Sequence, residues 1–270
     1  MPHRLLPPLP AHARETLVRF LRGHVEGSGA SGVVVGLSGG VDSATAAILA
    51  VEALGRERVQ ALYLPDAPGT GGPAGEVRQF AEGLGLSLIE LNLGPWLDRL
   101  SSDLPELSDR RVLGNVKARL RMVALYAKAN ARGSLVLGTG NKSELLLGYY
   151  TKYGDGGADL LPLGDLYKTP LYTLARELGV PEPILARPPT AGLYAGQTDE
   201  EELGAPYDLL DAILYGLERV WEPSEIAEEL SVPLERVLTV VERVERNRHK
   251  RRLPPIPKLG LRTVGLDWRD

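Results

Sequence analysis

The stretch "GLSGGVDSAT", residues 36–45, follows the valine run "SGVVV" and precedes the alanine-rich segment "AAILAVEAL". A short apolar run is typical of a buried parallel strand, and the alanine-rich segment predicts a helix. Gly39 and Gly40 let the backbone turn tightly and leave no Cβ to obstruct a ligand. The expected helix points its unpaired N–H groups and positive dipole end back at this turn, which attracts anions. The stretch predicts a phosphate-binding turn, and a purely structural glycine corner is the alternative.

A carboxylate inside this turn is unexpected, because Asp42 would repel a phosphate. The arrangement makes sense if a divalent cation lies between them, since Mg²⁺ is typically held by one or two carboxylates together with phosphate oxygens. Ser38 and Ser43 add hydroxyl donors on either side. The turn therefore predicts a metal-assisted phosphate site.

Composition narrows the class of protein. The chain has 270 residues and a net charge of −4, which does not favour a nucleic-acid binder. No apolar run approaches the roughly 18 residues of a membrane span. The opening "MPHRLLPPLP" has no apolar signal core, so we expect a cytoplasmic location. Cysteine is absent, which excludes disulfides, zinc–thiolate sites, iron–sulfur clusters and a cysteine nucleophile.

Apolar segments alternate with helical patterns through the first half of the chain. Strands are expected near 33–37, 58–65, 86–93 and 134–140. This alternation predicts an α/β fold with a doubly wound parallel sheet and ligands at the carboxyl ends of its strands. The glycine turn at 138–140 would lie at the same edge as the turn at 36–43.

The second half has a different character. A long polar loop covers 149–170, and loops of this length in compact domains are usually functional or disordered. Helices are expected near 206–219, 223–231 and 233–249, followed by a basic tail. We predict a single domain over 1–270, with an N-terminal helical arm (1–32), an α/β core (33–205) and a helical C-terminal cap with its tail (206–270).

Several separated motifs carry a family resemblance. They are "SGGVDS" (38–43), "GNVKARLRM" (114–122), "GTGNKSE" (138–144), "TKYGDGGADLLPLGDLYKT" (151–169), "PPTAGL" (188–193), "GQTDEEELGAPYDLLDAIL" (196–214) and "HKRR" (249–252). In this order the chain resembles the ammonia-dependent NAD synthetases, which belong to the ATP pyrophosphatases with an S-G-G-x-D-S loop. The resemblance covers about residues 33–252 and implies a Rossmann-like core of the ATP pyrophosphatase type.

The resemblance implies a two-step ligase reaction. ATP first adenylates the carboxylate of nicotinic acid adenine dinucleotide (deamido-NAD) and releases pyrophosphate, and ammonia then displaces AMP to give NAD. The loop should hold the β- and γ-phosphates and leave the α-phosphorus open to attack. The P-loop pattern G-x-x-x-x-G-K-[ST], which serves transfer of the γ-phosphoryl group, is absent from the sequence.

The resemblance also implies roles for individual residues. The ATP-binding residues are Gly36, Leu37, Ser38, Gly39, Gly40, Val41, Asp42, Ser43, Thr139, Lys168 and Thr190. Asp42 and Glu144 would hold Mg²⁺, the implied metal cofactor. Taken alone, Glu144 could be a first-turn glutamate that favours the helix dipole, and Thr139 could be ordinary turn chemistry.

Five further residues are implied on the dinucleotide side, namely Arg119, Lys152, Asp159, His249 and Lys250. Asp159 would orient the pyridine ring or accept the proton released as ammonium becomes ammonia; it joins Asp42 and Lys168 as the catalytic residues. On geometry alone, Arg119 lies at the edge of a helical apolar stripe and could simply cover apolar surface. His249 taken alone reads as a surface histidine.

The loop at 66–75, "DAPGTGGPAG", departs from the family by lacking polar side chains for adenosine, so no adenine-recognising residue is assigned. Without cysteine the chain has no thiol for glutamine hydrolysis, so ammonia would be free or supplied by a separate glutaminase. The resemblance further implies a homodimer, and we expect neither a nucleic-acid nor a membrane partner.

The sequence leaves three alternative functions. Another S-G-G-x-D-S adenylating ligase, such as a tRNA-modifying enzyme, shares the loop, but the sulfur-inserting versions depend on cysteines. A helix-turn-helix DNA-binding protein is suggested by 223–252, but its second helix begins apolar and acidic at "PLERVLTVVERVE". A non-catalytic nucleotide sensor would not need both Asp42 and Glu144.

Overall fold

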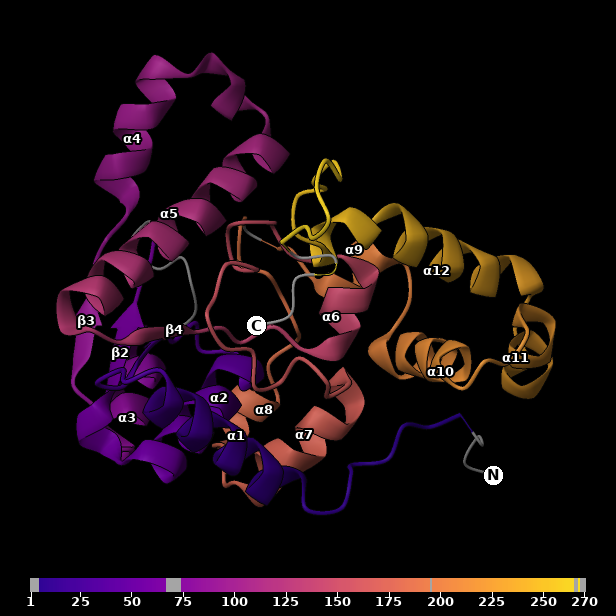
Figure 1. The fold of residues 1–270 in the computed structure, drawn as a ribbon, viewed down its shortest axis with the longest axis horizontal. Helices are drawn as coiled ribbons and strands as arrows, with labels where there is room; N and C mark the ends of the chain where they lie inside the picture. Colours follow the sequence, from indigo (N-terminus) through magenta and orange to yellow (C-terminus); the bar gives the residue numbers. More distant parts are fainter. Residues whose placement is uncertain (1–4, 67–73, 195, 265–266, 268–270) are drawn as a thin grey trace.

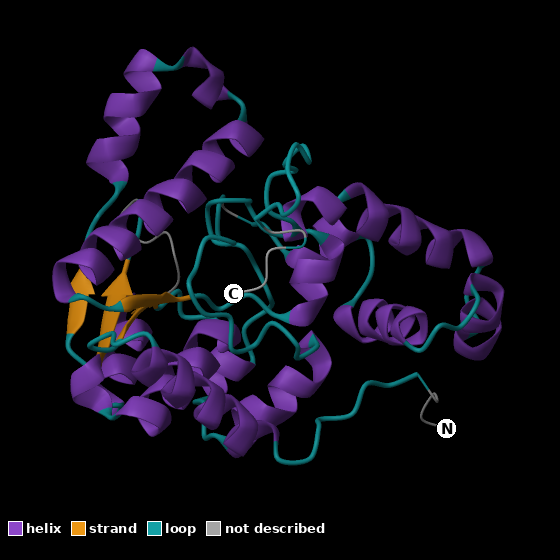
Figure 2. Ribbon diagram, viewed as in Figure 1, coloured by secondary structure: helices purple, strands orange, loops and turns teal. Residues whose placement is uncertain are grey.

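The predicted strands form one parallel sheet in the computed structural model, which describes residues 5–66, 74–194, 196–264 and 267 (Figure 2). Its four strands stand in the order β3-β2-β1-β4. Their bounds are β1 Val33–Gly36, β2 Val59–Tyr63, β3 Leu88–Glu90 and β4 Leu135–Leu137. Val33 is the partner of Val59 in β2 and of Leu135 in β4. The predicted doubly wound parallel sheet is confirmed.

Helices connect and cover these strands (Figure 1). Their bounds are α1 Ala13–Gly27, α2 Val41–Leu54, α3 Ala74–Gly83, α4 Gly94–Asp103, α5 Arg110–Arg132, α6 Lys142–Leu147, α7 Lys168–Glu177, α8 Glu182–Leu185 and α9 Asp199–Leu203. Short 3₁₀ turns lie at Arg56–Arg58, Pro105–Ser108 and Arg248–Arg251. No helix in the described part of the chain is long and apolar enough to cross a membrane.

Both faces of the sheet are buried, as the uninterrupted valine run predicts. Val33 and Val35 of β1 belong to an apolar cluster that includes residues of α1, α2 and α7, which we call the sheet core. Val34, between them, joins a cluster with Leu62, Val136 and Ala124 of α5 on the opposite face. In Figure 1, α1, α2 and α7 accordingly lie below the strands and α5 lies above them.

The C-terminal helices bury a separate cluster. They are α10 Tyr207–Glu218, α11 Pro223–Leu230 and α12 Leu234–Arg246, close to the predicted segments. Ile213, Ile226 and Val237, one from each helix, are fully buried together in what we call the cap core. The central valines of α12, Val237 and Val240, are buried in this core. This part of the apolar face of α12 therefore packs inside the protein.

The N-terminal arm reaches the cap core as well as the sheet core. From α1 the arm extends beneath the molecule toward α10 and α11 (Figure 1). Leu5 is fully buried in the cap core. Its Cδ1 lies 3.2 Å from the position that a Cβ on Gly216 would take, so this glycine makes room for it. The arm therefore ties the cap to the rest of the fold.

We expect Leu5→Ala to lower the free energy of unfolding by about 2–5 kcal/mol, because it opens a cavity in a packed core. Leu6 is the matched control, since its side chain is 48% exposed. Leu6→Ala should change stability by less than about 0.5 kcal/mol. Urea denaturation of both variants measures the difference, and equal effects would show that the arm does not anchor the cap.

The segment between α6 and α7 is irregular, as the sequence predicts for 149–170. It touches the sheet through an isolated parallel bridge between Leu137 and Leu160. Lys168 ends the segment and begins α7. Residues 67–73 of the glycine- and proline-rich loop, where no adenine contact was assigned, lie outside the described residues.

Candidate active site

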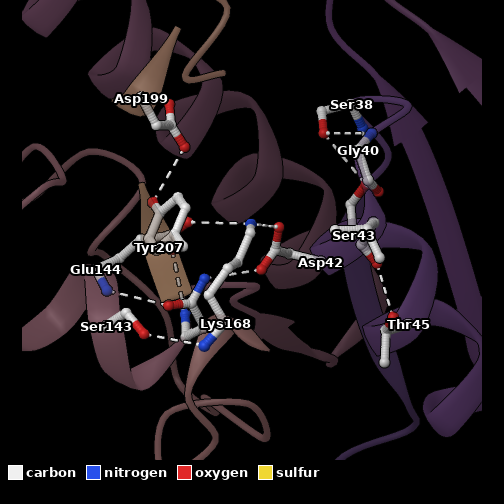
Figure 3. Close-up of polar contacts among 12 residues, drawn as sticks. Ser38, Gly40, Asp42, Ser43, Thr45, Ser143, Glu144, Lys168, Asp199 and Tyr207 are labelled. Carbon is white, nitrogen blue, oxygen red and sulfur yellow. Dashed lines mark hydrogen bonds and ion pairs between the residues drawn. The ribbon is translucent and has the colours of Figure 1, made fainter. Parts of the chain in front are cut away.

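The turn between β1 and α2 is held by hydrogen bonds among its own groups (Figure 3). The Ser43 hydroxyl donates to the carbonyl of Gly40 at 3.0 Å and accepts from the Ser38 amide at 3.2 Å. Gly39 has a φ of +81°, a left-handed conformation that glycine adopts without strain. Gly40 is the N-cap of α2 and has no capping side chain. The helix therefore presents its first amides to this turn, which is the arrangement predicted for binding an anion.

Asp42, in the first turn of α2, meets side chains from two other elements. Its Oδ2 lies 2.5 Å from Nζ of Lys168, the first residue of α7. The same Nζ lies 3.7 Å from Oε1 of Glu144 in α6. Lys168 is 2% exposed, so its ammonium is a buried cation between two carboxylates. Asp42 thus forms one charged cluster with two residues that lie more than a hundred positions further along the chain.

The charges of this cluster shift one another's ionisation. Desolvation, followed by the charge of Asp42, raises the pKa of Glu144 well above its ordinary value. Desolvation alone would lower the pKa of Lys168, but the charges of Asp42 and Glu144 outweigh it and raise that pKa. The pair of carboxylates therefore favours a cation beside it, and Lys168 supplies one.

A layer of buried polar groups positions the charged cluster. Asn141 donates from Nδ2 to Asp42 at 2.8 Å, and it caps α6 by accepting from the Glu144 amide at 3.0 Å. Glu144 returns a capping bond to the Asn141 amide, so the ordinary helix-start explanation for Glu144 also holds. The Lys168 amide donates to the hydroxyl of Ser143 at 2.9 Å, and that hydroxyl donates to buried Asp211.

Tyr207 forms another wall of the cluster. Lys168 Nζ lies 5.4 Å from the centroid of its ring, within the range of a cation–π contact. The Tyr207 hydroxyl donates to Oδ2 of Asp199 at 3.1 Å, as Figure 3 shows. Asp199 is 3% exposed, and desolvation raises its pKa. The aromatic ring thus adds a favourable contact to the buried ammonium.

The cluster opens into a cavity of about 870 Å³ at the carboxyl ends of β1, β2 and β4. Parallel sheets bind ligands at this edge, where the strand order reverses. The lining includes these predicted residues: Gly36, Leu37, Ser38, Gly40, Val41, Asp42, Ser43, Thr139, Glu144, Lys168, Thr190 and Lys250. The predicted phosphate, metal and tail residues are therefore brought together by the fold.

The chain was compared with known proteins. The model of the family described as NAD synthase matches residues 13–254. The chain belongs to the NAD synthase family. A relative named NH(3)-dependent NAD(+) synthetase, from Methanosarcina acetivorans, is 44% identical over 250 residues, which are 92% of this chain and 98% of the relative.

Solved structures of the NAD synthase family share the fold. An NH3-dependent NAD synthetase from Campylobacter jejuni aligns with a TM-score of 0.78 at 31% identity, covering 92% of this chain and 98% of its own. An NMN synthetase from Francisella tularensis aligns with a TM-score of 0.81 at 33% identity, covering 93% and 99%. The predicted fold type and family are therefore confirmed.

Of the residues predicted for the dinucleotide side of this family, Lys250 lines the cavity, whereas Arg119, Lys152 and His249 lie next to one another outside its described lining. Arg119 donates from Nη2 to the Lys152 carbonyl at 3.3 Å. Lys152 Nζ donates to the carbonyl of His249 at 2.7 Å. Lys250 reaches back to the carbonyls of Gly148 and Tyr150 at 2.6 and 2.8 Å. These contacts join α5, the long irregular segment and the tail into one surface beside the cavity.

Asp159 also lies outside that lining, and its carboxylate is engaged with the sheet. Its Oδ2 accepts from the Val136 amide at 2.7 Å, and its Oδ1 accepts from the Tyr126 hydroxyl at 2.9 Å. These bonds join the irregular segment to β4. The assignment of Asp159 to the pyridine ring stays a prediction.

Sequence reasoning missed several charged residues that line the cavity, among them Arg121, Asp155, Arg187 and Asp199. Asp155 lies in the same glycine-rich motif as Asp159 and accepts from the Thr151 amide at 2.8 Å. Desolvation raises its pKa. Its place in the motif at 151–169 was the only sequence signal for Asp155. An irregular loop has no regular period from which to predict which side chains face inward.

Proposed function

We propose that this member of the NAD synthase family is an ammonia-dependent NAD synthetase. It adenylates the carboxylate of deamido-NAD with ATP, releases pyrophosphate, and forms NAD when ammonia displaces AMP. One observation carries the proposal: the anion-binding turn and the Asp42–Lys168–Glu144 cluster face the same large cavity. A triphosphate tail and the acid that attacks its α-phosphorus can therefore be held together in one space.

The residues of the turn would bind the departing pyrophosphate. The hydroxyls of Ser38 and Ser43 and the first amides of α2 are fixed donors, and such preorganised donors stabilise charge that develops in the transition state. Lys168 is already held at the cavity by its bond network and would neutralise phosphate oxygens. Because the substrate carboxylate attacks first and ammonia second, catalysis rests on positioning and electrostatics and requires no covalent enzyme nucleophile.

A magnesium ion fits this chemistry. In the described residues there is no group of three or more histidine, cysteine, aspartate or glutamate side chains arranged for a metal ion. Two carboxylates, those of Asp42 and Glu144, share one cation, and such a pair suits Mg²⁺ when phosphate oxygens complete its shell. Bound there with ATP, the ion would offset negative charge on the phosphates.

We assign Thr139 and Thr190, which line the cavity, to the ATP phosphates. The dinucleotide would meet Lys250 at the cavity and Arg119, Lys152 and His249 on the adjoining surface. Asp159 would orient the pyridine ring or receive a proton from ammonium. For either role its carboxylate would have to give up its hydrogen bonds with the Val136 amide and the Tyr126 hydroxyl.

We further propose a homodimer in the cytoplasm that uses free ammonia or ammonia from a separate glutaminase. The absence of cysteine from the sequence supports the proposed ammonia source, because no thiol is present to hydrolyse glutamine. We also propose that residues 1–270 act as one domain, since the cavity is lined by both the α/β part and α12. The helix-turn-helix alternative is disfavoured because Val237 and Val240 of α12 pack inside the cap core.

The direct test combines the protein with ATP, Mg²⁺, ammonium and deamido-NAD and follows the products. We expect NAD, AMP and pyrophosphate to appear in equal amounts, and chelation of the metal should stop all three. Formation of ADP and orthophosphate, or no turnover, would refute the proposed reaction.

The assay should also offer nicotinic acid mononucleotide, because the Francisella tularensis neighbour is named an NMN synthetase. We expect a higher kcat/KM for the dinucleotide, since the surface beyond the cavity carries Arg119, Lys152 and His249. A preference for the mononucleotide would correct the substrate while leaving the chemistry of the site in place.

A further inference from the structure

Arg187 lies on the cavity wall and contacts the phosphate-binding turn directly. It follows α8 and precedes the segment that contains Thr190. Its Nη1 donates to the carbonyl of Gly39 at 2.6 Å. Its Nη2 donates to Oε2 of Glu76 in α3 at 2.5 Å. The guanidinium therefore joins the turn, α3 and the cavity wall at one point.

The guanidinium occupies the place that a side chain at Gly39 would take. A Cβ on this glycine would lie 2.7 Å from Nη1 of Arg187. Gly39 has a left-handed φ, and its carbonyl accepts a hydrogen bond from the guanidinium. The arginine head thus lies against the backbone of the turn that we assign to pyrophosphate.

Arg187 is the kind of cation that suits this ligand. A planar guanidinium presents several donors in a fork that matches phosphate oxygens, and it is charged at every physiological pH. Its side chain is 21% exposed, so it faces solvent in the cavity as well as its two protein acceptors. The carbonyl of Gly39 and the carboxylate of Glu76 both bind the guanidinium through oxygen atoms. A pyrophosphate would offer oxygen acceptors in their place.

We propose that Arg187 is a further pyrophosphate-binding residue of this site, with Glu76 as the counter-ion that holds it while the triphosphate tail is absent. The inference rests on the proposed function, because it assumes that the turn binds the leaving group. Arg187 lines the cavity and Glu76 is 37% exposed, so a more highly charged anion in the cavity can compete with Glu76 for the guanidinium.

A purely structural brace predicts a different pattern of variants. If Arg187 and Glu76 only stiffened the turn, removing either residue would weaken binding. If Glu76 competes with the ligand for Arg187, removing its charge leaves the guanidinium free for pyrophosphate. The two variants should then act in opposite directions.

The test is calorimetric titration of inorganic pyrophosphate into the full chain with excess Mg²⁺. We expect Arg187→Ala to weaken binding by about tenfold to a hundredfold, the range for a lost charge-assisted hydrogen bond. Arg187→Lys should be intermediate, because it keeps the charge and loses the fork. Glu76→Gln should bind pyrophosphate more tightly than the unchanged chain.

Arg78, which lies in α3 two residues after Glu76, provides a matched control. It forms an ion pair with Glu90, with Nε 2.6 Å from Oε1, away from the described cavity lining. Arg78→Ala should leave pyrophosphate affinity unchanged. Should Arg187→Ala fail to fold, Arg187→Lys and Glu76→Gln still carry the comparison.

Equal affinities for the unchanged chain and Arg187→Ala would overturn the inference, as would weakened binding in both Arg187→Ala and Glu76→Gln. These outcomes differ from failure of the proposed function. That failure would appear as an unchanged chain that binds pyrophosphate yet forms no NAD. No pyrophosphate binding by the unchanged chain would overturn both.

Discussion

The Asp42→Asn variant is expected to lose adenylation by about 10²- to 10³-fold while keeping its fold. The substitution preserves the shape of the side chain and removes its negative charge. Asp42 is one of two carboxylates proposed for the metal, and its Oδ2 is 2.5 Å from Lys168 Nζ. Exchange of labelled pyrophosphate into ATP, measured with deamido-NAD and without ammonium, isolates the first step.

Asp165 provides the control for this experiment. Its carboxylate pairs with Lys142 at 2.9 Å but its side chain is 95% exposed. Asp165→Asn should retain near-normal exchange, because an exposed ion pair contributes little. Near-normal exchange in Asp42→Asn itself would refute both the metal assignment and the proposed role of the cluster.

Lys168→Met is expected to abolish turnover and to destabilise the protein by about 3–5 kcal/mol at neutral pH. The methionine keeps most of the volume and removes the buried positive charge that lies between Asp42 and Glu144. The partly buried carboxylate of Asp42 then loses its cationic partner. Denaturation by urea at several pH values measures the loss of stability.

The sign of the pH dependence follows from Glu144, whose pKa is raised to about 8 in the folded protein from an ordinary value of 4.5. Between these values the folded state retains a proton that the unfolded state releases, so stability falls as pH rises. Lys168 lowers this pKa, and its removal should extend the fall to higher pH. Below about pH 8 both proteins lose stability in parallel, so the deficit of Lys168→Met should grow only above about pH 8.

Magnesium offers a second measurement on the same variant. A divalent ion can supply the charge that the lysine no longer provides, so Mg²⁺ should raise the melting temperature of Lys168→Met more than that of the unchanged chain. Calcium-free magnesium titrations followed by circular dichroism measure this shift. A deficit independent of both pH and Mg²⁺ would mean that Lys168 acts only through packing.

The sequence was most informative where local chemistry and fold agree. The valine run at 33–35 and the glycines at 39 and 40 predict a strand, a tight turn and a helix, because each residue's local preference matches its final environment. Asp42 stood out for the opposite reason, since a carboxylate in an anion-binding turn requires a cation. The family motifs then indicated Glu144 as the second metal carboxylate and Lys168 as a phosphate contact.

The sequence was less informative about contacts between residues that are far apart in the chain. Arg187 lies 148 positions from Gly39, and it sits in a connecting segment whose residues have no helical or strand period. Leu5 lies beside Leu6 in a proline-rich stretch, and no pattern there predicts that Leu5 is buried in the cap core while Leu6 is exposed. Asp155 and Asp159 share one glycine-rich loop, and only the folded path shows that the first lines the cavity while the second bonds to Val136.

Lys168 lies at the boundary between the sheet core and the cap core. The residue before it, Tyr167, is buried in the cap core, whereas Leu171 and Leu174, one and two turns later, are buried in the sheet core. Sliding of one packed region past the other would consequently carry the ammonium with it and alter its distance from Asp42. We therefore expect a ligand that contacts both regions to change the position of the Lys168 ammonium relative to Asp42.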